Sequence, residues 1–247
     1  MSKLIYNYHT HTSRCGHAIG EDEEYIKKAI DFGIKRLGIS DHIFFPGFNE
    51  PGVRGNYEQL DEYLNTFRNF REKYKDKVEM KIGFEAEYFP SYKEYYFDLI
   101  KKGDIEYLIL GQHYGEFDGK FRPYYENIMR YAEDVKEAVS LGIFKYVAHP
   151  DHFLLGVKSW NEECEKVARI IFEACEKSNI PIEINILGIR QYRPYPCKEF
   201  FRLSKEYKLK YVLGVDAHNP NDFNQPDIDK AFEYLEELGI DIIDLII

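Results

Sequence analysis

The amino-acid sequence predicts an α/β protein whose parallel strands form a closed or nearly closed barrel. Two observations carry this prediction: the alternation of β-like and helix-like segments, and the polar side chains at the ends of the β-like segments. Seven β-like runs occur along the 247 residues, at 3–9, 35–42, 78–88, 106–113, 144–150, 181–186 and 210–218. Because a helix-like segment follows each run, the strands should lie parallel in one sheet that helices cover.

The helix-like segments are amphipathic, with apolar residues near helical spacing and glycine at several ends. The clearest of them occupy 21–33, 57–74, 126–142, 161–178 and 227–239. No linker rich in proline, glycine or serine divides the chain. We therefore expect residues 1–247 to form a single domain. A doubly wound open sheet would show the same alternation, so the alternation alone does not select the barrel.

Polar side chains at the ends of the runs favour the barrel over the open sheet. Six of the seven runs carry a potential metal ligand at or just beyond the C-terminal end: His9 and His11, His42, Glu85, His113, His149, and Asp216 with His218. The sixth run brings Glu183 and Asn185, with Arg190 beyond it. Ligands from many strands converge only where the strand ends surround one mouth, which is the C-terminal face of a barrel.

The spacing of these residues indicates what they bind. Side chains alternate along a strand, so His9 and His11 should point to the same side and could share a cation. Asp216 and His218 repeat that spacing. Imidazoles with a few carboxylates suit zinc, manganese or iron better than calcium, and Glu85 has two oxygens with which to bridge two ions.

Composition excludes several other classes of protein. The net charge of −10 argues against a long nucleic-acid tract, because binding the phosphate backbone requires a basic surface. The N-terminus lacks the apolar core of a signal peptide, and no apolar run approaches bilayer length. The four cysteines are scattered without paired spacing, which is typical of reduced thiols. We therefore expect a cytoplasmic protein with no membrane partner. The oligomeric state is not predicted.

The motifs HTHTSRCGHA, ISDH, GFEAEY, GQHY, AHPD, EINILGIR and GVDAH, which run over nearly the whole chain, together resemble the PHP (polymerase and histidinol phosphatase) superfamily. Among its members, the chain is most similar to the monofunctional histidinol-phosphate phosphatases, and the segment RCGHA favours that branch. The resemblance implies a distorted (β/α)7 barrel of the TIM type, with two to three metal ions at the C-terminal ends of the strands.

The resemblance also implies which residues bind each ion. One ion would be held by His9, His11, Glu85 and Asp216. A second would be held by Glu85, His113 and His149, with Glu85 as the bridge. The third would be held by His17, His42 and His218. Glu87, two residues after Glu85 on the same strand face, is an alternative ligand. His152 has no counterpart in the motifs, and we interpret it as a structural residue.

The implied reaction is hydrolysis of L-histidinol phosphate, a small phosphate monoester, in histidine biosynthesis. A hydroxide held between two zinc, manganese or iron ions would attack the phosphorus. A third ion, or an acid such as Asp41 or Asp151, would assist the leaving alkoxide, although either carboxylate could instead orient a metal-bound histidine. Arg14, Arg190 and Arg193 could clamp the phosphate, because a guanidinium matches phosphate oxygens. Arg190 is favoured among them because it lies two residues beyond the ILG turn that follows the sixth run.

Three other functions share part of this pattern. A phosphoesterase of the same superfamily that acts on nucleotides would use the same ligands and differ in its loops. An amidohydrolase-like enzyme would also have HxH on its first strand and a late aspartate, but such enzymes commonly bridge their metals with a carbamylated lysine, where this chain has Glu85. A nonenzymatic metal-binding protein would have the ligands without turnover.

Overall fold

The computed structural model describes residues 3–124 and 127–247, and its centre is a seven-stranded parallel sheet. The strand order follows the chain, β1-β2-β3-β4-β7-β8-β9. The strands are β1 (Tyr6–Asn7), β2 (Arg36–Ile39), β3 (Glu79–Ala86), β4 (Tyr107–Leu110), β7 (Phe144–Val147), β8 (Ile182–Asn185) and β9 (Tyr211–Gly214). Each lies within one of the seven predicted runs, so the predicted number and order of strands are confirmed.

The sheet curves round until its two edge strands meet. Beyond the ends of β1 and β9, Thr10 pairs with Ala217, and the amide of His11 donates to the carbonyl of Ala217 at 2.9 Å. The join between β7 and β8 rests on one strand pair, Val147 with Ile182. The result is a nearly closed, distorted barrel, as predicted, and a doubly wound open sheet is excluded because its outer strands would not meet.

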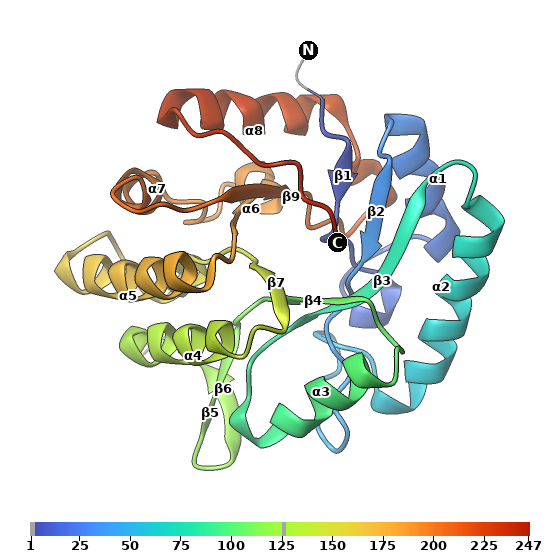
Figure 1. The fold of residues 1–247 in the computed structure, drawn as a ribbon, viewed down its shortest axis with the longest axis horizontal. Helices are drawn as coiled ribbons and strands as arrows, with labels where there is room; N and C mark the ends of the chain where they lie inside the picture. Colours follow the sequence, from blue (N-terminus) through green and yellow to red (C-terminus); the bar gives the residue numbers. More distant parts are fainter. Residues whose placement is uncertain (1–2, 125–126) are drawn as a thin grey trace.

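Helices surround the strands on the outside (Figure 1). They are α1 (Asp22–Phe32), α2 (Leu60–Tyr74), α3 (Lys93–Lys101), α4 (Ile128–Ser140), α5 (Glu162–Ser178), α6 (Ile186–Arg190), α7 (Lys198–Ser204) and α8 (Gln225–Leu238). Short 3-10 turns add η1 (Ser13–Cys15), η2 (Tyr57–Gln59), η3 (Pro90–Tyr92), η4 (His152–Gly156) and η5 (Pro220–Asp222). All five predicted helical segments are present; the first position of the one at 126–142 lies outside the described residues. No helix in the described ranges has the length and apolar character needed to cross a bilayer.

A small antiparallel hairpin, β5 (Tyr114–Phe117) with β6 (Lys120–Pro123), follows β4 and is absent from the predicted runs. Asp118 and Gly119 form its turn, both with positive φ, and an Asp-Gly pair between two strands is a strong hairpin signal. In Figure 1 the hairpin projects from the barrel beside α4. It places Tyr114 and Pro123 next to the strand ends that carry the predicted ligands.

The barrel separates two apolar cores. The outer core lies between strands and helices, and the inner core fills the barrel, with Tyr6, Tyr8, Tyr107, Ile109, Tyr146, Ala148 and Val212. Most of these residues are two apart on one strand, as inward-facing positions must be. Gly38 makes room for them, because a Cβ there would overlap the Tyr107 ring. The interior is therefore packed below the strand ends and contains no through channel among the described residues.

The C-terminal segment covers the barrel end opposite the predicted ligands. Ile243 donates its amide to the Tyr211 carbonyl at 2.9 Å, and its own carbonyl accepts from the Tyr6 hydroxyl at 2.9 Å. The side chains of Ile243, Leu245 and Ile247 pack against the inner core. Figure 1 shows the C-terminus in the middle of the view, beside β1 and β2.

We expect Ile243→Ala to destabilise the protein, because it removes apolar cover from the inner core. Ile243 is half-buried, so the loss should be about 1–2 kcal/mol, roughly half of that for a fully buried isoleucine. Thermal unfolding should show a lower Tm, by about 2–8 °C for a chain of this size. Ile246→Ala is the matched control, because Ile246 is 70% exposed and should change little. Equal shifts for the two variants would contradict this account of the segment.

Candidate metal centre

The predicted ligands come together in one cavity at the C-terminal ends of the strands. Its volume is about 490 Å³. Eight of the nine predicted ligands line it: His11, His17, His42, Glu85, His113, His149, Asp216 and His218. The ninth, His9, lies fully buried directly beneath, with its Nε2 3.4 Å from Oδ1 of Asp216. The convergence that the strand-end pattern predicts is therefore present in the fold.

Glu85, near the end of β3, stands at the centre of the cluster. Its Oε1 lies 3.5 Å from His9 Nε2, 3.5 Å from His113 Nε2 and 2.7 Å from His149 Nε2. Its Oε2 lies 3.3 Å from His11 Nε2 and 3.2 Å from His42 Nδ1. Each oxygen thus faces a different set of imidazoles, which is the arrangement that a bridging carboxylate requires.

His9, His11 and Asp216 form a group at the seam where the barrel closes. Their ligand atoms lie within 4.8 Å of one another, and the Nε2 atom of His11 is 3.2 Å from Oδ1 of Asp216. The two imidazole rings are 5.2 Å apart, so both point into the site as the HxH spacing predicts. Asp216 has a φ of 51°, a left-handed conformation that costs a non-glycine residue about 1–3 kcal/mol.

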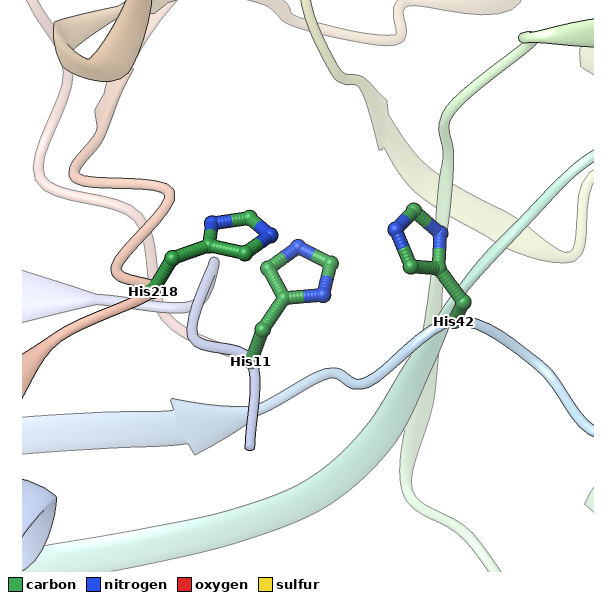
Figure 2. A group of neighbouring side chains, drawn as sticks. All are labelled: His11, His42 and His218. Atoms are coloured by element: carbon green, nitrogen blue, oxygen red, sulfur yellow. The ribbon is translucent and has the colours of Figure 1, made fainter. Parts of the chain in front are cut away.

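His42 and His218 face each other across His11, as Figure 2 shows. The ring of His11 lies 4.1 Å from that of His218 and 4.5 Å from that of His42. His17, on the exposed loop after η1, approaches from outside, with its Nε2 2.9 Å from Nε2 of His218. The structure thus brings His17, His42 and His218 together, and it adds His11 to their neighbourhood.

His113 and His149 lie on the other side of Glu85, with their rings 4.9 Å apart. His113 continues the inward-facing positions of β4, two residues after Gly111. His149 does not fit the alternation of β7, in which Tyr146 and Ala148 face inward. Its positive φ of 29° breaks the alternation and lets the imidazole reach Glu85.

The donor atoms of this cluster fit metal ions. Within the described residues, several buried polar atoms have no hydrogen-bond partner: His9 Nε2, both ring nitrogens of His11, His42 Nδ1, His149 Nδ1 and Asp216 Oδ1. Buried polar atoms are normally satisfied. It is therefore unusual that four of these atoms, His9 Nε2, His11 Nε2, His42 Nδ1 and Asp216 Oδ1, point towards Glu85 or towards one another. Imidazole nitrogens with a few carboxylate oxygens are the donors that zinc, manganese and iron favour.

Charges within the cluster agree with this interpretation. Burial would raise the pKa of Glu85 and Asp216, but the surrounding histidines outweigh it and hold both pKa values well below the usual range. Burial, with His11 nearby, lowers the pKa of His218 to about 3. Both carboxylates are therefore ionised at neutral pH, and the His218 imidazole is neutral with a free lone pair, as metal ligands must be.

Three carboxylates lie next to ligand imidazoles on the side that faces away from Glu85. Glu183 of β8 lies 2.9 Å from His9 Nδ1, and Glu87 lies 3.2 Å from His113 Nδ1. Asp41 Oδ1 is 3.6 Å from His11 Nδ1. Each faces the ring nitrogen that points away from Glu85, and the hydrogen bonds of Glu183 and Glu87 fix the tautomer and orientation of His9 and His113. Glu87 is engaged with Arg54 as well, so the geometry favours Glu85 as the central carboxylate.

The three residues predicted to act on the substrate do not line the cavity. Asp41 is buried and accepts a hydrogen bond from the Thr12 hydroxyl. Asp151 accepts from the Cys197 amide at 2.6 Å, and burial raises its pKa to about 7. The guanidinium of Arg190 is paired with Asp222 at 3.0 Å and lies 3.7 Å from Asp227. Of the alternatives, Arg14 pairs with Asp22 and Glu62, whereas Arg193 lines the cavity.

His152, interpreted from its sequence context as a structural residue, also lines the cavity. Its ring lies 4.8 Å from that of His113 and 5.3 Å from that of Tyr195. The spacing in AHPDH contains a usable signal, because a turn in which the His152 amide donates to the His149 carbonyl at 2.9 Å brings the two rings to 5.1 Å of each other. Tyr195 and Gln191, from the segment after α6, complete this wall.

A barrel of parallel strands with a histidine and carboxylate cluster at its mouth defines a metal-dependent hydrolase of the TIM-barrel type. A sequence model of the PHP domain matches residues 7–186, and the chain belongs to this family. The matched segment contains every predicted ligand except Asp216 and His218, which lie beyond it.

Two known proteins of similar sequence are each named probable histidinol-phosphatase. A Deinococcus radiodurans protein named probable histidinol-phosphatase is 26% identical over 227 residues, covering 87% of this chain and 86% of its own length. A Schizosaccharomyces pombe protein with the same name is 22% identical, covering 94% and 86%. The crystal structure of histidinol phosphate phosphatase from Lactococcus lactis, in complex with zinc, L-histidinol and phosphate, aligns with a TM-score of 0.73 at 19% identity, covering 98% and 96%.

Gly111, between β4 and His113, leaves the space that Glu85 occupies, because a Cβ at position 111 would overlap the Glu85 carboxylate. Its φ is not positive, so alanine would fit the local backbone. We expect Gly111→Ala to displace Glu85 and reduce bound metal as Glu85→Ala does. Elemental analysis after dialysis would measure this, with circular dichroism as the check on folding. A folded Gly111→Ala protein with the metal content of the wild type would contradict the central place given to Glu85.

Proposed function

We propose that this protein hydrolyses the phosphate monoester L-histidinol phosphate to L-histidinol and phosphate, as a metal-dependent histidinol-phosphatase in histidine biosynthesis. The observation that carries the proposal is the Glu85 carboxylate, placed among five imidazoles at the base of an open cavity. The names of the relatives from D. radiodurans and S. pombe, and the ligands of the L. lactis structure, support this choice of substrate.

The proposed cofactors are two to three divalent ions of zinc, manganese or iron. His9, His11, Glu85 and Asp216 would hold one, Glu85, His113 and His149 a second, and His17, His42 and His218 a third. When bound, such ions neutralise phosphate charge and lower the pKa of a water molecule so that it can attack at neutral pH. The four cysteines are unpaired in the structure, which agrees with the proposed location in the reducing cytoplasm.

The chain's own residues would fix the ligands before the substrate arrives. Glu183 accepts from His9 Nδ1, so Nε2 of His9 stays directed at Glu85 and Asp216. Asp41 is placed to do the same for His11, and the Thr12 hydroxyl holds Asp41. Asp41 therefore has a positioning role in this proposal. Ligands held in this way lose little freedom on binding, which is the advantage of a preorganised site.

The phosphate end of the substrate would meet Arg193. This residue lines the cavity beside Gln191 and Tyr195. Its guanidinium can donate two hydrogen bonds to phosphate oxygens. Arg190 acts elsewhere in this proposal: it pairs with Asp222, whose carboxylate accepts from the amides of His218 and Asn219 and so shapes the loop that carries His218.

The organic end of the substrate would lie against the aromatic and apolar part of the wall, where Tyr114, Leu155 and Leu187 join the lining. An imidazole ring can stack on an aromatic side chain such as Tyr114 or Tyr195. Burial raises the pKa of Asp151 to about 7, but this carboxyl does not line the cavity and so is out of reach of the leaving alkoxide, which a bound ion would assist instead.

Turnover of a panel of phosphate monoesters, after reconstitution with manganese, zinc or iron, tests the substrate. We expect kcat/KM for L-histidinol phosphate to exceed that for p-nitrophenyl phosphate or a mononucleotide by at least about a hundredfold, or roughly 2.7 kcal/mol of discrimination. Removing the metal should abolish hydrolysis and leave most of the barrel folded, because the core does not depend on the metal.

Three results would count against this function. Full activity in a verified metal-free sample would exclude the proposed chemistry. Better turnover of a nucleotide or oligonucleotide would overturn the substrate and leave the metallophosphoesterase in place. Bound metal without hydrolysis of any phosphoester or amide would instead favour a nonenzymatic metal-binding protein.

Substitutions of Arg193 and Arg190 should have different effects on kcat/KM and on metal content. Arg193→Ala should lower kcat/KM for histidinol phosphate by about 10- to 100-fold with metal content unchanged, because it removes hydrogen bonds to a charged group worth about 1.5–3 kcal/mol. Arg190→Ala should act through the His218 loop and lower metal content. Elemental analysis beside the kinetics distinguishes the two. A loss of kcat/KM in Arg190→Ala at full metal content, with Arg193→Ala unaffected, would return the phosphate clamp to Arg190.

A further inference from the structure

The strongest feature outside the ligand set is a fully buried ion pair between Arg54 and Glu87. Arg54 donates from Nη2 to Oε1 of Glu87 at 2.8 Å and from Nη1 to Oε2 at 3.0 Å, in the bidentate geometry of a strong pair. Both side chains have no exposed surface. Arg54 also lies over the rings of Phe45 and Phe48, at 5.4 and 5.2 Å.

This pair contacts the metal cluster on one side through His113. Oε1 of Glu87, which accepts from Arg54, is also 3.2 Å from Nδ1 of His113. The opposite ring nitrogen, Nε2, faces Glu85 at 3.5 Å. Arg54, Glu87, His113 and Glu85 therefore form one continuous chain from a buried cation to the central carboxylate.

The same arginine holds the loop that follows His42. Its Nη1 donates to the carbonyl of Ile43 at 3.3 Å, next to His42. Its side chain also contacts Glu50 at 3.1 Å. Within this loop, the carbonyl of Gly52 lies 3.1 Å from Nδ1 of His17, and Gly52 and Val53 line the cavity. Arg54 therefore fixes the same loop that orients His17.

Stability alone is a weak reason for such a pair. Removing an arginine and a carboxylate from water is expensive, and well-packed apolar residues in their place are often equally stable or more so. The contacts with His113, Ile43 and the loop that carries Gly52 give a better reason. We propose that Arg54 and Glu87 are positioning residues that set the orientation of His113 and the placement of the His17 loop, and so couple two of the metal positions.

This inference rests on the proposed metal centre, but its test requires no substrate. The affinity of the purified full-length protein for zinc, manganese or cobalt is measured by competition with a chelator. We expect Glu87→Gln to weaken the binding of at least one ion by about 10- to 100-fold, the usual effect of losing such a partner. Glutamine keeps the size of the side chain, but its amide cannot hold both Arg54 and the His113 ring as the carboxylate does.

A double variant, Arg54→Met with Glu87→Leu, separates positioning from stability. It leaves no unpaired buried charge, so it should fold, and its metal-free Tm should be close to or above that of the wild type. Its metal affinity should still be reduced as in Glu87→Gln. Arg130→Met is the matched control: Arg130 pairs with Asp134 on α4 and does not line the cavity, so its metal affinity should be that of the wild type.

A folded double variant with wild-type metal affinity would overturn the inference and leave the pair a structural feature. Metal binding as tight as that of the wild type in Glu87→Gln alone would also overturn the inference. Failure of the wild type to hydrolyse histidinol phosphate, with weakened metal binding in both variants, would overturn the proposed substrate and leave the inference standing.

Discussion

The mutual neutralisation of Glu85 and the imidazoles around it is the interaction on which the rest of this structure depends. A fully buried carboxylate is costly unless opposite charge or hydrogen bonds surround it. Here His9, His11, His42, His113 and His149 come from the ends of β1, β2, β4 and β7, so their approach to Glu85 on β3 requires the sheet to curve. Asp216, beyond β9, meets His9 and His11 only because the barrel closes. The packed tyrosine interior below the site and the seam between Thr10 and Ala217 provide that closure.

The order and number of strands could be predicted because they depend on local patterns. Each strand lies in a short apolar run, and each ligand follows a run at a fixed offset, so chain order alone brings the ligands to one face. The HxH spacing was sufficient for His9 and His11. His149 could be placed at the strand end by its motif but not oriented, because its side chain depends on a positive φ that breaks the alternation of β7.

Other features depend on contacts that no local pattern contains. Arg190 was the favoured clamp for its place after the ILG turn, but α6 continues through it and turns its guanidinium towards Asp222. The chain then reverses at Tyr192, which has a φ of 53°, and this reversal accompanies the return of Arg193 to the cavity. The pair of Arg54 and Glu87 joins residues 33 positions apart in the chain, and neither residue type is expected to be buried on its own.

The fold holds some ligands more firmly than others, and the proposed metal positions can be ranked by how firmly their ligands are held. His9, His11, Glu85 and Asp216 are buried, and the backbones of His9, His11 and Glu85 take part in the pairing of the sheet or its seam. His17 lies on an exposed loop, and its Nδ1 is near the carbonyls of Cys15, at the end of η1, and of Gly52, on another loop. Local opening of loops costs less free energy than opening of core strands. Of the proposed metal positions, the one that includes His17 is therefore the one whose geometry the barrel determines least. In our proposal, the loop anchored by Arg54 orients His17 in place of the barrel.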